Sequence, residues 1–199
     1  MVFVVTGPSG SGKSTILRHI IKDMRGLAFS VSHTTRPRRD SERDGREYHF
    51  VSEAEFRRLA AREAFLEWAV VHDHLYGTSK EEIRRQGRSS DVILDIDVQG
   101  ARQIRRRLPG AVLVFVLPPS FAALRRRLVD RGEDDPAAVR TRLRNAKAEI
   151  REAGRFDYLI VNDRLDRAIL ELEAIILSVR CRAENRKRAL RSALAGRAG

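Results

Sequence analysis

Short apolar runs alternate along most of the chain with longer segments of helical periodicity. The runs are rich in valine, isoleucine and leucine, which is typical of strands buried on both faces of a parallel sheet. Strands that alternate with helices predict an α/β fold of three layers, with a parallel sheet covered by helices on both faces. The predicted strands are Val2–Val5, Leu27–Ser32, Val92–Asp97, Val112–Leu117 and Tyr158–Val161.

Residues 33–80 interrupt this alternation. They are polar and rich in arginine, and they contain the only tryptophan, Trp68. Ser52 and Glu55 form a capping-box pattern that predicts a short helix from residue 53 to about residue 62. We therefore expect one domain over 1–199, with a core of 1–32 and 81–199 and a small lobe inserted at about 33–80.

The last third of the chain is predominantly helical in pattern. Ser120 is a predicted N-cap for a helix over Phe121–Val129, and a second helix is predicted over Ala137–Ala153. The charged break between these helices predicts a short lid at about 130–145. Apolar residues at helical spacing then predict a long helix that packs on the sheet, through Leu165, Ile169, Leu172, Ile176 and Val179.

Composition narrows the class of protein. No apolar run approaches the ~20 residues of a membrane span. The first predicted strand begins almost at Met1, so we expect no leader peptide. The single cysteine, Cys181, rules out a disulfide framework within one chain, so we expect a reducing, cytoplasmic setting. The net charge is +12, but the basic residues are spread along helices, and we expect no specific nucleic-acid partner and no membrane partner.

Residues 7–14 match the phosphate-loop pattern G-x-x-x-x-G-K-[ST] between a predicted strand and a predicted helix over Thr15–Ile21. Backbone N–H groups of such a loop, together with the helix N-terminus, attract phosphate oxygens. Lys13 can then reach the β- and γ-phosphates of ATP, and Ser14 can bind Mg²⁺. The predicted ATP-binding residues of this loop are Gly7, Pro8, Ser9, Gly10, Ser11, Gly12, Lys13, Ser14 and Thr15.

A second set of polar residues lies at the ends of the second and third predicted strands and between them. It combines closely spaced arginines with two tyrosines, small hydroxyl side chains and three carboxylates. Arginine and phenol groups suit a phosphate monoester. A carboxylate suits guanine, whose N1–H and amino group point the same way, whereas adenine has no such pair of donors. The set comprises Ser32, Arg36, Arg39, Tyr48, Glu67, Tyr76, Thr78, Asp95 and Asp97.

With these motifs in this order, the sequence resembles the guanylate kinase family of P-loop nucleoside monophosphate kinases, from about Val2 to about Ile176. The resemblance implies phosphorylation of GMP, and of dGMP, by ATP with Mg²⁺. It implies that Arg36, Arg39, Tyr48 and Tyr76 hold the GMP phosphate, and that Ser32, Glu67 and Thr78 read guanine. Asp95 and Asp97 would lie near the base, ribose or Mg²⁺ waters. Arg131 and Arg142 would act from the lid, and Asn162 and Asp163 would lie near adenine.

The arginine group departs from the family order Thr-Thr-Arg-x-Pro-Arg. Here Pro37 comes one place early and Arg38 is an extra arginine, although Arg39 keeps the family spacing from Arg36. Each part of the set also has a structural alternative. The arginines could form a solvated face, and Glu67 could be an ordinary helix-end charge. Asp95 and Asp97 could cap the helix that follows them.

Two other functions remain compatible with these motifs. The chain could be a guanylate-kinase-like interaction module that has lost catalysis, although the intact Lys13 and Ser14 argue against this. It could also phosphorylate a different phosphorylated acceptor, although Glu67 and Thr78 favour guanine. Self-association into a homo-oligomer is compatible with the sequence.

Overall fold

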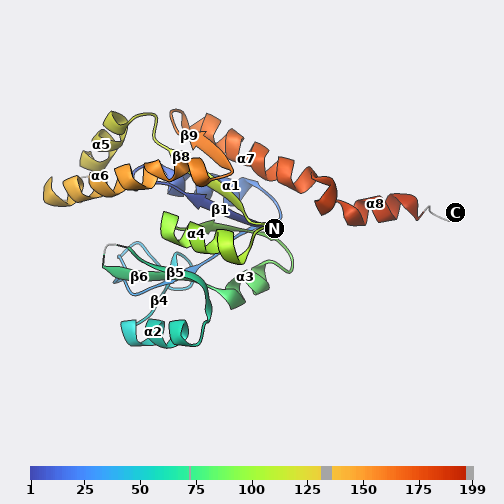
Figure 1. The fold of residues 1–199 in the computed structure, drawn as a ribbon, viewed down its shortest axis with the longest axis horizontal. Coiled ribbons are helices and arrows are strands. Elements are labelled where there is room, and N and C mark those ends of the chain that lie inside the picture. Colours follow the sequence, from blue (N-terminus) through green and yellow to red (C-terminus); the bar gives the residue numbers. More distant parts are fainter. Residues whose placement is uncertain (72, 131–135, 196–199) are drawn as a thin grey trace.

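The central sheet is parallel throughout and has the strand order β2-β7-β1-β8-β9. The fold is taken from a computed structural model that describes residues 1–71, 73–130 and 136–195 (Figure 1). Each strand overlaps one of the five predicted apolar runs, so the predicted α/β fold is confirmed. The strands are β1 (Val2–Thr6), β2 (Leu27–Phe29), β7 (Asp91–Asp95), β8 (Val112–Leu117) and β9 (Tyr158–Val161).

Helices cover both faces of this sheet. On one face, α1 (Lys13–Asp23) and α7 (Leu165–Cys181) pack against alternate residues of the strands, with Ile20, Leu172 and Ile176 fully buried. On the other face, α4 (Val98–Arg107) packs with Ala101 and Ile104, and α3 (Lys80–Gln86) lies beside it. This arrangement is the predicted three-layer fold. Leu165, which we expected in the core, instead lies at the exposed start of α7.

A second sheet is built from residues between 32 and 79, in the order β4-β3-β6-β5. Its strands are β3 (Ser32–Thr34), β4 (Tyr48–Phe50), β5 (Phe65–Val71) and β6 (His74–Ser79). α2 (Glu53–Ala61) packs on it through Phe56, and the Ser52 hydroxyl accepts from the Glu55 N–H at 3.2 Å, as the capping pattern predicts. The lobe therefore has a small core of its own.

The prediction of one strand over Leu27–Ser32 is wrong. β2 and β3 belong to different sheets, because the Ser30 N–H makes the last hydrogen bond to β7, at Ile93 O, before the chain leaves the central sheet. Ser32 then pairs with Tyr48 in the second sheet. The next strand also ends earlier than predicted, at Asp95 rather than Asp97, since Asp97 is the N-cap of α4.

The remaining helices follow the order expected from sequence. α5 (Phe121–Val129) begins at Ser120, whose hydroxyl accepts from the Ala123 N–H at 3.0 Å. α6 (Pro136–Arg151) is followed by the short 3₁₀ turn η1 (Ala153–Arg155). The predicted helix over 137–153 therefore ends two residues early. Beyond α7, η2 (Ala183–Asn185) breaks the helix before α8 (Lys187–Leu194), which extends away from the body of the molecule (Figure 1).

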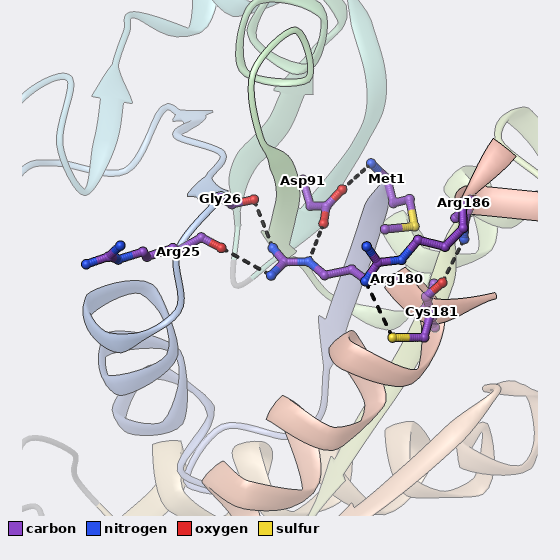
Figure 2. A network of polar contacts seen from close by, with 9 residues as sticks. Met1, Arg25, Gly26, Asp91, Arg180, Cys181 and Arg186 are labelled. Carbon is purple, nitrogen blue, oxygen red and sulfur yellow. Dashed lines mark hydrogen bonds and ion pairs between the residues drawn. The ribbon is translucent and has the colours of Figure 1, made fainter. Parts of the chain in front are cut away.

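Arg180 ties the end of α7 to the start of the chain (Figure 2). Its guanidinium donates to Asp91 at 2.7 Å and to the backbone oxygens of Arg25 and Gly26 at 3.1 and 2.9 Å. The Asp91 carboxylate also binds the α-amino group of Met1 at 2.6 Å. One arginine thus joins the beginnings of β1 and β7 to the loop before β2.

Candidate functional site

The phosphate loop joins β1 to α1 and keeps the backbone shape that its glycines permit. Gly12 is the N-cap of α1 and has a left-handed φ of +94°. A Cβ at this position would lie 2.2 Å from Nδ2 of Asn162, so neither the backbone angle nor the space suits a larger residue. Lys13 folds back over the loop and donates to Gly7 O at 2.5 Å. Its ammonium therefore lies where the loop would receive phosphates.

Asn162 supports this loop through a hydrogen bond to its main chain. It is 5% exposed and follows β9, and its amide donates to Ser11 O at 2.7 Å. Arg127 of α5 adds hydrogen bonds to Ser11 O and Asn162 O, at 3.4 and 3.0 Å. Asn162 thus contacts the back of the phosphate loop, and its place near adenine, implied by the resemblance, stays a prediction. Asp163 is exposed, and its carboxylate accepts from the Arg164 N–H.

A cleft of about 630 Å³ lies between the phosphate loop and the second sheet. Most of the residues singled out from the sequence line it. Ser11, Arg36, Thr78, Asn162 and Asp163 lie outside the lining, and Arg131 lies outside the described residues. The predicted residues that line the cleft are Gly7, Pro8, Ser9, Gly10, Gly12, Lys13, Ser14, Thr15, Ser32, Arg39, Tyr48, Glu67, Tyr76, Asp95, Asp97 and Arg142.

Glu67 places a buried carboxylate at the wall of the cleft opposite the phosphate loop. It is 2% exposed and accepts a hydrogen bond of 2.5 Å from the Thr78 hydroxyl. The Thr78 hydroxyl oxygen lies 3.4 Å from that of Ser32, so Glu67, Thr78 and Ser32 form one row of hydrogen-bonded side chains. Burial raises the pKa of Glu67 to about 7, and the Thr78 hydrogen bond only partly opposes this. Glu67 is therefore a strand residue rather than the helix-end charge considered as an alternative.

The arginine group divides around Glu42. Arg36 is paired with the Glu42 carboxylate at 2.7 Å, and its guanidinium lies 5.5 Å from the centre of the Tyr48 ring. This ion pair raises the pKa of Arg36, while the same pair helps to hold the pKa of Glu42 low against the effect of its burial. Arg38 points elsewhere and donates to the Glu42 backbone oxygen at 2.8 Å. Of these three arginines, Arg39 is the one whose side chain lines the cleft.

The two tyrosines lie together beside this group. Tyr48 of β4 and Tyr76 of β6 pack edge to face, with ring centres 5.8 Å apart. Burial, followed by the nearby Asp95 charge, raises the pKa of Tyr48 to about 12. Its hydroxyl therefore keeps its proton at neutral pH and can donate a hydrogen bond to an anion.

Asp95 ends β7 and Asp97 caps α4, and the two carboxylates have different partners. Asp95 ends the strand beside Val5, and burial raises the pKa of its carboxyl while the Lys13 ammonium opposes the rise. Asp97 accepts from the Gly100 N–H at 2.9 Å and from Gln99 Nε2 at 2.9 Å. The capping alternative thus describes Asp97, which also lines the cleft, whereas Asp95 lines the cleft and is influenced by the charge of Lys13.

The sequence and the fold both match those of known proteins. A family model described as "Guanylate kinase" matches residues 1–179. The chain belongs to the guanylate kinase family.

Individual guanylate kinases match nearly the whole chain. This chain is 49% identical over 176 residues to the guanylate kinase of Dechloromonas aromatica, and the match covers 88% of this chain and 87% of that protein. It is 51% identical over 185 residues to that of Symbiobacterium thermophilum, covering 92% and 87%. The crystal structure of guanylate kinase from Anaplasma phagocytophilum superposes with a TM-score of 0.77 at 28% identity, covering 92% of this chain and 87% of that one.

Two charged residues of this guanylate kinase cleft were not singled out from the sequence. Arg18 lies one turn along α1 from Ser14, where it donates to the Ser14 backbone oxygen at 3.3 Å. Glu149 lines the cleft from α6, seven residues after Arg142. Burial raises the pKa of Glu149, against the opposing effect of Lys13. Arg18 lies four residues after Ser14, and Glu149 lies seven residues after Arg142. Residues at these spacings share one face of a helix, so the sequence held a signal for both.

Proposed function

We propose that the chain transfers the γ-phosphoryl group of ATP to the phosphate of GMP or dGMP, producing ADP and GDP or dGDP. The observation that carries this proposal is the arrangement of one cleft. Lys13 and the phosphate loop form one wall, and the buried Glu67 with Tyr48 and Tyr76 forms the other. Such a cleft can hold two phosphate esters end to end, with a purine base at the far side.

The donor side would act on the charge of ATP. The loop N–H groups and the Lys13 ammonium would stabilise the β- and γ-phosphates, after Lys13 exchanges its present contact with Gly7 O for a phosphate oxygen. Arg142 of α6 lines the same cleft and would neutralise charge on the transferring group. We assign Arg131 the same role on the strength of the family resemblance.

Mg²⁺ would be held mainly through the nucleotide. Among the residues that the structure describes, no group of three His, Cys, Asp or Glu side chains could hold a metal ion. The Ser14 hydroxyl at the start of α1 and the Asp95 carboxylate both line the cleft, and oxygen ligands are those that Mg²⁺ prefers. These residues fit the ion: Ser14 would bind it directly and Asp95 through its waters. When bound, Mg²⁺ supplies neutralisation of phosphate charge.

The acceptor side would position GMP. Glu67 would accept hydrogen bonds from N1–H and the amino group of guanine, while Ser32 and Thr78 hold that carboxylate and the base edge. Arg36, Arg39, Tyr48 and Tyr76 would bind the phosphate. An oxygen of this phosphate would attack the γ-phosphorus of ATP, and the bond from that phosphorus to the β,γ-bridging oxygen would break to release ADP.

The reaction needs no dedicated general base, because the acceptor phosphate is already an anion near neutral pH. Positioning and charge neutralisation are therefore the main tasks of the side chains. We place the reaction in the cytoplasm, as expected from the single cysteine. In the described part of the chain, no helix combines the length and apolar character that crossing a membrane requires.

A substrate panel tests the proposal. ATP consumption is measured with GMP, dGMP, AMP, CMP and UMP at matched concentrations, with and without Mg²⁺. We expect GMP and dGMP to support turnover and the other three nucleotides to support at least about 10³-fold less, because their bases leave Glu67 unpaired. Equal turnover with AMP would contradict guanine recognition, and no turnover with any acceptor would favour the interaction-module alternative.

A further inference from the structure

Three side chains of α4 form a row along the free edge of β5. They are Gln99, Gln103 and Arg107, spaced four residues apart, and each contacts main-chain atoms of β5. β5 is the last strand of the second sheet, so among the described residues its outer edge has no strand neighbour. Figure 1 shows α4 between the two sheets, with β5 beside it.

The contacts follow the strand in steps of two residues. Gln99 Nε2 donates to Val70 O at 3.1 Å. Gln103 contacts both polar groups of the Trp68 backbone, accepting from its N–H at 3.3 Å and donating to its oxygen at 2.7 Å. Arg107 donates to Leu66 O at 2.5 Å and to Phe65 O at 3.3 Å. The helix and the strand therefore run in opposite directions along this row.

The regularity has a geometric cause. Four residues of an α-helix rise about 6 Å, and two residues of a β-strand rise about 6.6 Å. A row of side chains at every fourth helix position thus matches the outward-facing carbonyls at every second strand position. The side chains replace the hydrogen bonds that a neighbouring strand would supply, and the primary amide of Gln103 reproduces both a donor and an acceptor.

Glu67 lies in the middle of the stretch that this row holds. Its neighbours Leu66 and Trp68 are both bound through their main chain. α4 also limits the Glu67 carboxylate directly, since a Cβ on Gly100 would lie 2.4 Å from Glu67 Oε2. The same helix therefore fixes the backbone on each side of Glu67 and leaves space for its carboxylate.

We propose that Gln103, assisted by Gln99 and Arg107, is a positioning residue for guanine recognition. It holds β5 so that the Glu67 carboxylate faces the cleft at a fixed depth. This inference rests on the proposed function, because it assigns Gln103 a role in a guanine contact that Glu67 makes. The competing explanation is that the row only covers a strand edge, which would protect the fold without affecting substrate binding.

The test compares Gln103→Met with Arg106→Met. Methionine matches glutamine in length and helix propensity but forms neither hydrogen bond, and Arg106 is an exposed residue of the same helix. We expect Gln103→Met to raise the KM for GMP about tenfold, to change the KM for ATP less than about twofold, and to speed hydrogen exchange at the Trp68 amide. Arg106→Met should change none of these quantities.

Each result decides between positioning and edge cover. Faster exchange at Trp68 with an unchanged KM for GMP would overturn the proposal in favour of edge cover. An equal rise in both KM values would also overturn it, as general loosening. If Gln103→Met does not fold, Arg107→Met, which removes contacts at an exposed position, is measured by the same criteria. Failure of the proposed function is distinguished separately, because the unmodified protein would then show no preference for GMP.

Discussion

At the scale of the residue, Lys13 carries the clearest prediction. Its ammonium is held at the phosphate loop and contacts the main chain at Gly7, so replacing it with alanine should leave the fold intact. We expect Lys13→Ala to lower kcat by on the order of 10²-fold or more, because the charge that stabilises the transferring phosphoryl group is lost. Steady-state kinetics with GMP, together with an unchanged circular dichroism spectrum, checks this. Near-normal turnover would contradict the assignment of the phosphate loop.

Glu67 should make GMP binding depend on pH. The pKa of about 7 means that protonation below neutrality removes the acceptor that guanine needs, so the KM for GMP should rise as pH falls from 8 to 6. The effect on stability has the opposite sign. Because folding raises the pKa of Glu67 from 4.5 to about 7, the folded state binds the proton more tightly than the unfolded state does. The free energy of unfolding therefore falls as pH rises through this range.

Glu67→Gln separates this effect from the titration of GMP itself, whose phosphate has a pKa near 6. The variant should raise the KM for GMP by roughly 10²-fold or more at pH 8, because the amide N–H faces guanine donors, and it should change ATP affinity little. Its remaining pH dependence should be that of the phosphate alone. Comparable damage to both KM values would indicate a structural role for Glu67.

The arginine group should divide unevenly. Arg39 lines the cleft and Arg36 lies over Tyr48, whereas Arg38 is tied to the Glu42 main chain. We expect Arg36→Ala and Arg39→Ala each to lower kcat/KM for GMP by about 30-fold or more, as for the loss of a charge-assisted contact in a closed site. Arg38→Ala should cost less than about fivefold. If Arg38→Ala were the most damaging of the three and Arg39→Ala were silent, the early position of Pro37 would have shifted the register.

At the scale of the element, the phosphate loop depends on a residue from the far end of the sheet. Asn162 follows β9 and donates to Ser11 O, and its amide lies where any Cβ on Gly12 would be. Asn162→Ala would leave the buried Ser11 oxygen with a weaker set of donors and open space behind the loop. We expect the KM for ATP to rise about five- to tenfold, while the KM for GMP changes less than about twofold. A larger effect on GMP than on ATP would contradict this buttressing role.

The sequence predicted the elements well where one physical cause acts alone. Apolar runs located the strands of the central sheet, and serine hydroxyls located the starts of α2 and α5. Prediction failed at Ser30, because the composition of the segment stays suitable for a strand while its hydrogen-bond partner changes from β7 to the second sheet. The support of the phosphate loop by Asn162 was likewise missed, since it joins residues 151 positions apart.

At the scale of the whole molecule, Arg180 links segments that are distant in sequence (Figure 2). Arg180→Met would remove one ion pair and two hydrogen bonds to main-chain oxygens, while Asp91 would keep its contact with the Met1 amine. We expect a loss of about 2–3 kcal/mol in the free energy of unfolding, which lowers Tm by roughly 5–10 °C. Arg182→Met, an exposed neighbour, is the matched control in thermal denaturation. An equal Tm for both variants would show that the linkage adds little.

Met1 and Arg180 both bind the Asp91 carboxylate, so the start of β1 and the end of α7 come together at one side chain. The chain starts at β1, in the middle of the central sheet, and returns at the end of α7 to the same carboxylate, Asp91. A single carboxylate therefore closes a loop of contacts that runs from β1 through the central sheet to α7. Of the described residues after Arg180, none lines the cleft, so this loop of contacts and the cleft are built from the chain up to α7.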